Sequence, residues 1–255
     1  MAFLQCEIES SSLRAPTRVY AILPQDMPQS SAPRATLYLL HGRGQDALSW
    51  VRYTAVERYA EQYNVSIIMP EAGRSFYTNM RFGGEYFTYI TNELPYLCGR
   101  LFRIEEDPLK TYVFGLSMGG YGALKCALTY PERYAGCGAF SPMPDIHYRI
   151  SHTPQDDPKY RELQGVFGTE LEPDTREDLY KLAERTAAIQ QRPELYITCG
   201  SEDGLYSLNK SFCSYLNGLG YSHTFLEWPG RHEWEFWDVS LHRAMEHYFG
   251  KGVAL

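Results

Sequence analysis

The sequence predicts an α/β fold in which a mostly parallel sheet of eight strands is covered by helices on both faces. Short apolar runs alternate with segments of helical periodicity along the chain, which is typical of parallel strands joined by helices. The 255 residues are 44% hydrophobic, enough for one large core. Because no linker or internal repeat divides them, we expect a single domain over residues 1–255.

Eight apolar runs have the length and boundaries of strands. They cover residues 3–8, 17–23, 36–40, 65–69, 110–116, 134–140, 194–199 and 224–228. Six helical patterns lie between or after these runs, at about 49–62, 85–102, 119–130, 175–190, 205–219 and 233–249. This number and order of elements match the α/β-hydrolase fold.

The stretch from 141 to 192 departs from this alternation. It is rich in proline, with histidine and acidic residues interspersed, which favours loops and short helices over another strand. It follows the strand that ends near Phe140, and ligands of α/β sheets bind beyond the carboxyl ends of the strands. We therefore expect a partial lid or pocket wall after the sixth strand; a surface excursion without a role is the alternative.

Composition and charge exclude several classes of partner. The net charge is −7 and no run of Lys or Arg occurs, so we expect no nucleic acid partner. No segment approaches the ~20 apolar residues of a membrane helix, and the N-terminus lacks the pattern of a secretory signal. These features predict a cytoplasmic protein with no membrane partner. The six cysteines lack CxxC spacing and lie mostly in apolar runs, which predicts small buried side chains.

The motif GLSMG at 115–119 is the most informative feature of the chain. It follows an apolar run and precedes a helical pattern, so a serine flanked by glycines stands at a strand-to-helix turn. This context defines a nucleophile elbow, which exposes the serine hydroxyl near the positive end of a helix. The motif predicts Ser117 as a catalytic nucleophile, against the alternative of an ordinary turn.

Serine needs a general base, and in this fold the acid and then the histidine follow the serine along the chain. His232 comes after the strand at 224–228, on the loop where the base is expected. His223 precedes that strand and lies at the wrong end of the sheet, whereas His242 and His247 fall within the closing helix. The order of elements therefore predicts His232 as the base.

Two carboxylates follow the strand at 194–199 and are candidates for the acid. Asp203 precedes Gly204, which would let the chain bend so that the carboxylate faces the histidine. We predict Asp203 as the orienting acid, with Glu202 as the alternative. Asp238 is a weaker candidate because it lies on the helix after His232.

An oxyanion hole needs two backbone N–H groups. We expect one from Met118, directly after the serine, and the other from the glycine-containing loop after the third strand. In that loop Arg43 is the favoured donor and Gly42 the alternative. No further ligands are spaced with His41 to bind a metal ion, so we expect no metal site and assign His41 to anchoring the loop.

Aromatic residues crowd the loops near the expected strand ends. Trp234 and Met143 are the first candidates for the substrate-pocket wall, followed by Trp50 and Tyr77. Packing in the core is the competing interpretation for each aromatic residue. An aromatic wall would suit acyl groups from acetyl to cinnamoyl equally well.

Three segments together resemble a known group of enzymes. They are LLHGRG at 39–44, the stretch 112–127 with GLSMGGYGALKCA, and PGRHEWEFWD at 229–238. In this order they resemble the esterase D, antigen 85 and tributyrin esterase family, with the greatest likeness to its tributyrin and cinnamoyl (feruloyl) esterase branch. The resemblance implies hydrolysis of short-chain carboxylic esters by a serine–histidine–aspartate triad, without a metal or cofactor.

The resemblance leaves other functions open. A thioesterase like S-formylglutathione hydrolase is one alternative, although that branch has a different loop around the oxyanion-hole segment and the histidine. An acyltransferase that excludes water is another. A non-catalytic binding protein is a third, and the intact trio of candidate residues argues against it. Related esterases are often dimers, so a homo-oligomer is an expectation without an identified interface.

Overall fold

Our computed structural model describes residues 1–25, 33–171, 173 and 175–250, and eight strands form one sheet in this part of the chain. The strands are β1 (Ala2–Ser10), β2 (Ala15–Leu23), β3 (Ala35–Leu40), β4 (Val65–Pro70), β5 (Thr111–Leu116), β6 (Gly136–Phe140), β7 (Glu194–Gly200) and β8 (His223–Trp228).

The helices connect these strands. They are α1 (Ser49–Tyr53), α2 (Val56–Tyr63), α3 (Tyr86–Thr88), α4 (Leu94–Phe102), α5 (Met118–Thr129), α6 (Ile146–Ser151), α7 (Pro158–Phe167), α8 (Leu179–Ala187), α9 (Tyr206–Gly218) and α10 (Trp234–Phe249). A π-helical turn, η1 (Tyr89–Glu93), joins α3 to α4, and a 3₁₀ turn, η2 (Pro131–Arg133), follows α5.

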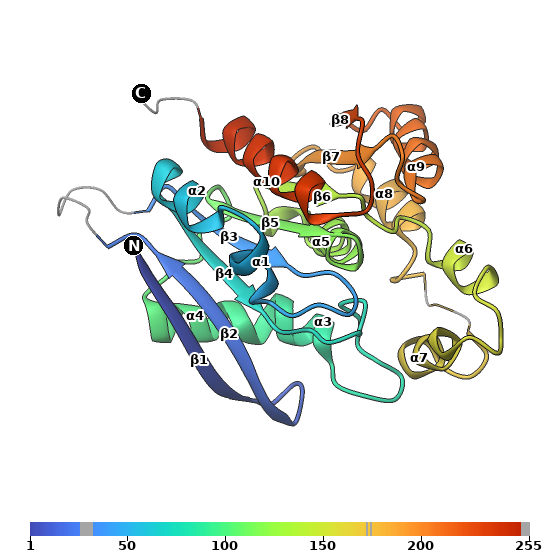
Figure 1. Cartoon of the computed structure of the whole chain (residues 1–255), viewed down its shortest axis with the longest axis horizontal. Coiled ribbons are helices and arrows are strands. Elements are labelled where there is room, and N and C mark those ends of the chain that lie inside the picture. Colours follow the sequence, from blue (N-terminus) through green and yellow to red (C-terminus); the bar gives the residue numbers. More distant parts are fainter. Residues whose placement is uncertain (26–32, 172, 174, 251–255) are drawn as a thin grey trace.

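The strand order in the sheet is β1-β2-β4-β3-β5-β6-β7-β8 (Figure 1). The strands from β4 to β8 in this order are parallel, whereas β2 is antiparallel to both β1 and β4. This is the α/β-hydrolase fold predicted from the sequence.

The core has two layers, one on each face of the sheet. In β3, Tyr38 and Leu40 belong to one layer, whereas Leu37 and Leu39 belong to the other. Helices α4, α5, α8 and α9 contribute to the first layer, and α1, α2 and α10 contribute to the second. Because both faces are covered, β3 and β4 are buried at every residue, which explains their continuous apolar sequences.

The carboxyl ends of the parallel strands meet at one edge of the sheet. Leu40, the last residue of β3, is followed by a loop and aligns with Gly115 near the end of β5. Leu116 aligns with Phe140, the last residue of β6. The last residues of β7 and β8 are likewise aligned with each other. The register therefore gathers the loops after five strands, which carry all the candidate catalytic residues.

Two of the expected helices are interrupted. The pattern at 49–62 forms α1 and α2 with a break at Thr54 and Ala55, where the Ala55 N–H donates to an Asp238 carboxylate oxygen at 3.0 Å. The pattern at 85–102 forms α3, the π-helical turn and α4 in succession. The first break combines a local bond, from the Val56 N–H to Thr54 Oγ1 at 3.2 Å, with the bond to Asp238, a side chain from the far end of the sequence, which local periodicity does not reveal.

The stretch 141–192 contains α6, α7 and α8, joined by loops, and no strand among its described residues. The helices α6 and α7 lie beyond the end of β6, at the right of Figure 1. Two main-chain hydrogen bonds fix the end of α7, from Arg81 N–H to Val166 O at 2.8 Å and from Phe82 N–H to Gly165 O at 2.9 Å. The predicted composition of loops and short helices is confirmed.

Two further expectations concern helices and cysteines. None of the helices in the described residues is both long and apolar enough to span a bilayer. Five of the six cysteines are buried as expected, and only Cys6 is partly exposed. Burial raises the pKa of the Cys199 thiol to about 12, so this side chain near the carboxyl end of β7 remains protonated at neutral pH.

Candidate active site

Ser117 stands at the turn between β5 and α5 in a strained backbone conformation, with φ +52° and ψ −113°. Its flanking glycines allow this turn. A Cβ on Gly115 would lie 2.3 Å from the Gly119 carbonyl oxygen, and a Cβ on Gly119 would lie 2.3 Å from the Leu40 carbonyl oxygen. The elbow geometry expected from the motif is therefore present, with the serine at the start of α5.

His232 and Asp203 converge on this serine. The Nε2 atom of His232 lies 2.9 Å from Ser117 Oγ, and its Nδ1 atom lies 2.8 Å from Asp203 Oδ2. Because a carboxylate can only accept, Nδ1 carries the proton and Nε2 is left to accept from the hydroxyl. The Trp237 ring packs edge-on against the imidazole at 4.8 Å. This arrangement can move the hydroxyl proton to Nε2.

Asp203 is buried, and its charge is compensated. Its side chain is 1% exposed, and its Oδ1 atom accepts the Leu205 N–H at 2.8 Å. Burial alone would raise the pKa of Asp203, but the hydrogen bond and charge of His232, together with the Leu205 N–H, hold that pKa below its ordinary value. The carboxylate therefore stays ionised at neutral pH and fixes the tautomer of the imidazole.

The turn that carries Asp203 is bonded to the loop that carries His232. The Glu202 N–H donates to the Gly230 carbonyl oxygen at 3.0 Å, and a Cβ on Gly200 would lie 2.2 Å from that oxygen. Gly200 is thus the glycine that this close approach requires. The chain turns at Gly204 as expected, with the Tyr206 N–H donating to the Asp203 carbonyl at 3.0 Å, but Gly204 has no positive φ and has open space around it, so the turn does not require a glycine there.

The rejected candidates for acid and base lie elsewhere. Glu202 pairs with Arg231 on the surface at 3.3 Å. Asp238 accepts the Ala55 N–H and the Tyr59 hydroxyl, so it fixes α10 to α2. The other histidines contact groups away from the triad: His223 the Tyr221 carbonyl, His242 the Tyr59 ring and His247 the Glu194 carboxylate. Among the described residues, no group of three or more potential ligands is arranged to hold a metal ion.

His41 anchors the loop after β3, as expected. Its Nε2 atom accepts the Ala72 N–H at 3.0 Å, so Nδ1 carries the proton and donates to the Gly42 carbonyl at 2.9 Å. Burial lowers the pKa of His41, which keeps the ring neutral. The Tyr77 hydroxyl donates to the His41 carbonyl at 3.0 Å. These bonds hold the loop at its first two residues.

The two oxyanion candidates in this loop differ in the state of their N–H groups. Gly42 and Arg43 both line the pocket beside Ser117. The Gly42 N–H donates to Gln45 Oε1 at 3.2 Å, whereas the Arg43 N–H has no hydrogen-bond partner within the described residues. Met118 is the first residue of α5, where N–H groups have no acceptor inside the helix. Arg43 is therefore the loop candidate with an available donor.

A depression of about 440 Å³ lies in front of Ser117 and His232. Trp234 lines it, and the Tyr53 ring stacks on Trp234 with 5.1 Å between their centroids. The remaining lining residues are Gly42, Arg43, Gln45, Leu116, Glu233, Glu235 and Trp237. The pocket lining thus contains both aromatic rings and the carboxylates of Glu233 and Glu235.

Three of the four pocket candidates lie behind this depression. Trp50 and Tyr77 are 0% exposed and Met143 is 7% exposed. The Trp50 ring packs edge-on against Phe140, and the Met143 N–H donates to the Ser117 carbonyl at 3.3 Å. These residues support the catalytic loops from within, and none of the three is among the residues that line the depression.

Sequence reasoning missed Tyr53 and Gln45 as pocket residues. Tyr53 is exposed because α1 ends there, and the unbroken pattern at 49–62 hid that end. Gln45 faces the pocket because its loop curls back so that the side chain reaches the Gly42 N–H. Thr54, whose hydroxyl accepts the Val56 N–H at 3.2 Å, is the local residue that could have signalled a helix end near the site.

Comparison with known proteins connects this geometry to a family. A family model described as "Putative esterase" matches residues 10–248. The chain belongs to this esterase family. The esterase is 31% identical to an acetyl esterase of Caldicellulosiruptor saccharolyticus over 263 residues, an alignment that covers 96% of this chain and 97% of the relative.

Two solved structures from Staphylococcus aureus are also similar to the esterase. The fluorophosphonate-binding serine hydrolase F (FphF) is 29% identical with a TM-score of 0.87. The S-formylglutathione hydrolase FrmB is 29% identical with a TM-score of 0.85. Each match covers 97% of this chain and 98% of the solved chain. The esterase is accordingly a serine hydrolase that acts on carboxylic esters.

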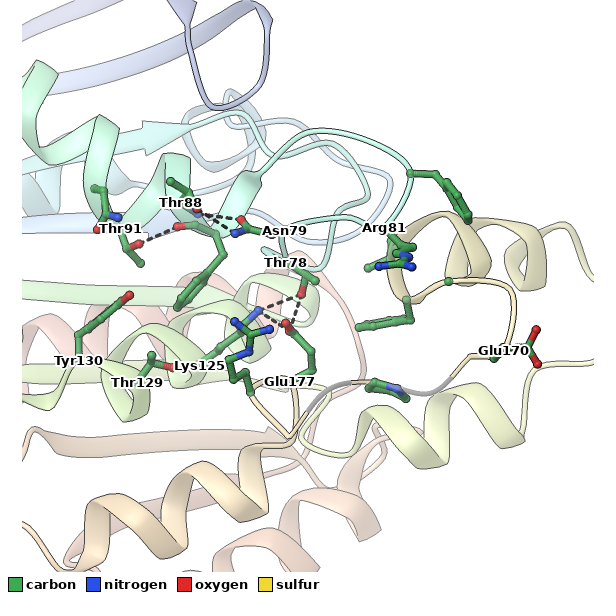
Figure 2. A pocket seen from close by; sticks show the side chains of 18 of the residues that line it. Thr78, Asn79, Arg81, Thr88, Thr91, Lys125, Thr129, Tyr130, Glu170 and Glu177 are labelled. Carbon is green, nitrogen blue, oxygen red and sulfur yellow. Dashed lines mark hydrogen bonds and ion pairs between the residues drawn. The ribbon is translucent and has the colours of Figure 1, made fainter.

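A second cavity of the esterase, about 690 Å³, lies at the other end of α5 (Figure 2). On its floor the Lys125 ammonium pairs with the Glu177 carboxylate, donates to Thr78 Oγ1 at 3.0 Å and lies 4.3 Å from the centre of the Phe87 ring. Burial lowers the pKa of Lys125, and the Glu177 charge opposes that shift. These groups satisfy one another. Through Glu177 they join α5 to the stretch 141–192 between β6 and β7, here called the insertion.

Proposed function

We propose that this esterase hydrolyses short-chain acyl esters through an acyl-enzyme on Ser117, with His232 as general base and Asp203 as the orienting acid. The observation that carries the proposal is the continuous series of hydrogen bonds from Ser117 Oγ through both imidazole nitrogens to the buried Asp203. Each group has the partner that its role requires.

The reaction follows from this geometry in two half-reactions. His232 Nε2 takes the hydroxyl proton while Ser117 Oγ attacks the ester carbonyl carbon, and the resulting imidazolium faces the ionised Asp203. Collapse of the tetrahedral adduct breaks the bond to the alcohol oxygen, which leaves with the proton from Nε2. Water then attacks the acyl-serine with the same base, releasing the carboxylic acid and restoring the serine.

The negative oxygen of each tetrahedral adduct needs donors that do not have to reorient. We assign the N–H groups of Met118 and Arg43 to this role, with Gly42 as the alternative in the loop. We prefer Arg43 to Gly42 because the Arg43 N–H is available, whereas the Gly42 N–H already donates to Gln45.

The likeness to an acetyl esterase supports a small acyl group. Trp50 and Tyr77 are fully buried and Met143 is nearly so, which leaves the depression of about 440 Å³ as the space for substrate. The stacked rings of Tyr53 and Trp234 offer an apolar surface beside it. An acetyl or propionyl ester fits this space without displacing a core side chain.

Hydrolysis of an S-formylglutathione thioester is the second candidate, supported by the likeness to the S. aureus enzyme FrmB. Glutathione carries a net negative charge, and Glu233 and Glu235 line the pocket of this chain. Repulsion from these carboxylates disfavours an anionic substrate, so we rank neutral oxygen esters above S-formylglutathione as substrates. We rank acyl transfer below both hydrolysis reactions because His232 is 36% exposed, so water can reach the base.

A panel of substrates tests this order. The panel contains 4-nitrophenyl acetate, butyrate and decanoate, methyl ferulate and S-formylglutathione. We expect kcat/KM to be highest for the acetate and to fall at least about tenfold at the decanoate, in line with the likeness to an acetyl esterase. A preference for S-formylglutathione over the acetate would overturn the substrate assignment and leave the triad untouched.

A further inference from the structure

A carboxylate of α7 connects the insertion to the candidate oxyanion loop. Glu162 Oε2 accepts from both Nε and Nη2 of Arg43, at 3.0 and 2.5 Å. Its other oxygen, Oε1, pairs with the guanidinium of Arg74 in the loop after β4. One side chain therefore joins three segments that are far apart in the sequence, and one of them carries a candidate oxyanion donor.

This ion pair is suited to fixing a position. The Arg43 and Glu162 side chains are only 23% and 26% exposed, so water and salt screen the pair less than a surface pair. Two donors of one guanidinium on the same carboxylate oxygen restrict orientation as well as distance. Burial would raise the pKa of Glu162, but Arg43 and Arg74 lower it, which keeps the carboxylate charged at neutral pH.

The backbone of Arg43 has few other restraints. Gly42 is held through both its N–H and its carbonyl, by Gln45 and His41. On the other side Gly44 has a φ of +76° and no atom within 4 Å of the position of a Cβ. A hydrogen bond from the Gln45 N–H to the Gly42 carbonyl at 3.3 Å closes a turn around Arg43 and Gly44. The Arg43 side chain connects this turn to α7.

We infer that Glu162 is a positioning residue, which holds the Arg43 N–H in the direction needed to stabilise the oxyanion. The insertion then contributes to turnover through the loop instead of through contact with the substrate. The end of α7 is itself fixed by main-chain bonds from Arg81 and Phe82, so Glu162 stands on a rigid support. This inference rests on the proposed function, in which Arg43 is an oxyanion donor.

The test compares Glu162→Gln with Arg74→Gln in hydrolysis of 4-nitrophenyl acetate, a neutral substrate whose binding is insensitive to the freed charges. Glu162→Gln keeps the shape of the side chain and weakens the bond to Arg43. Arg74→Gln breaks an ion pair to the same carboxylate but leaves the loop untouched, which makes it the matched control. Removing one oxyanion donor costs about 10²–10³ in turnover, so loosening one should cost about tenfold.

We expect Glu162→Gln to lower kcat about tenfold with KM within about twofold, since the donor acts mainly in the transition state. Arg74→Gln should stay within about twofold in both constants. Inhibition by a methyl trifluoromethyl ketone, which forms a tetrahedral oxyanion with the serine, should weaken by the same factor as kcat/KM. The double variant with Arg43→Gln should lose no more than the worse single variant, because both changes break one connection.

Three results would overturn the inference. They are a kcat of Glu162→Gln within about twofold of wild type, an equal loss in Arg74→Gln, and additive losses in the double variant. Ser117→Ala in the same assay separates this failure from that of the proposed function. If Ser117→Ala is inactive while Glu162→Gln is unaffected, only the positioning role is wrong.

Discussion

Helix α5 has a polar cluster at each end, and the two clusters differ in how completely their hydrogen-bonding groups are satisfied. At its start, Ser117 has a strained backbone, and its hydroxyl faces His232, which is partly exposed to water. Near its end, Lys125 is buried, Glu177 is 14% exposed, and acceptors surround the ammonium (Figure 2). Both clusters border a cavity, but only the first presents a hydroxyl that its neighbour can activate, whereas the charges of the second are already paired.

The cluster at the start of α5 is suited to catalysis, whereas the cluster near its end is suited to stabilising the fold. Ser117, His232 and Asp203 can exchange a proton because each lies next to a group of matched type and a substrate can enter beside them. Lys125 and Glu177 compensate each other's charge, and their ion pair holds the insertion on α5. Substitutions at the start of α5 should therefore lower kcat, whereas substitutions near its end should lower the free energy of unfolding.

The largest effect should come from Ser117→Ala. Without the nucleophile, kcat should fall by roughly 10⁵–10⁶, while Tm moves by less than about 2 °C because a small, partly exposed hydroxyl is lost. Steady-state hydrolysis of 4-nitrophenyl acetate and a thermal melt provide both numbers. Substantial activity left in the purified variant would exclude this serine as the nucleophile.

Asp203→Asn should have the next largest effect. An amide can present its N–H to Nδ1 and stabilise the wrong tautomer, so kcat should fall by about 10⁴. Glu202→Gln is the matched control, since its carboxylate pairs with Arg231 on the surface and should leave kcat nearly unchanged. If Asp203→Asn were fully active and Glu202→Gln were not, the acid assignment would pass to Glu202.

At the other end of α5, Lys125→Met should affect stability instead of chemistry. It leaves the Glu177 carboxylate buried without its cation, which should cost about 3–5 kcal/mol in the free energy of unfolding. Adding Glu177→Gln should restore part of that loss, because it removes the uncompensated charge. Urea unfolding measures both, and kcat per folded molecule should remain close to wild type. An unchanged stability in Lys125→Met would contradict the structural role.

The smallest effect is a pH dependence of stability. Because the pKa of Asp203 is lowered by folding, its ionised form stabilises the fold above the unfolded-state pKa of about 3.9. That contribution is lost as the pH falls through the lower, folded-state value. Relative to Asp203→Asn, wild type should therefore lose stability only below about pH 5. Urea unfolding at several pH values tests this, and a pH-independent difference would contradict the lowered pKa.

The fold was predictable because both faces of the parallel strands are covered. Continuous burial makes β3 and β4 apolar at every position, and such runs are visible without any tertiary information. The convergence of Ser117, Asp203 and His232 was predictable from the same parallel strands, since each residue comes after the carboxyl end of one of them. Strand order and fold geometry bring such residues to one edge.

Features that depend on distant side chains were not predictable. At the break after α1 the Ala55 N–H donates to Asp238, and no local pattern contains that contact. Trp50 in α1 and Tyr77 in the loop after β4 lie near the active edge, but packing directs both side chains into the core. The ion pair of Arg43 with Glu162 likewise joins charges that look like ordinary surface residues in the sequence.

The most direct test of the account uses a fluorophosphonate probe, which reacts with an activated serine and remains attached. Folded wild-type protein should gain one label, and peptide mapping should place it on Ser117. His232→Ala, which keeps the serine but removes its base, should label far more slowly. A label on another residue, or none on the folded protein, would contradict the claim that the imidazole activates this hydroxyl.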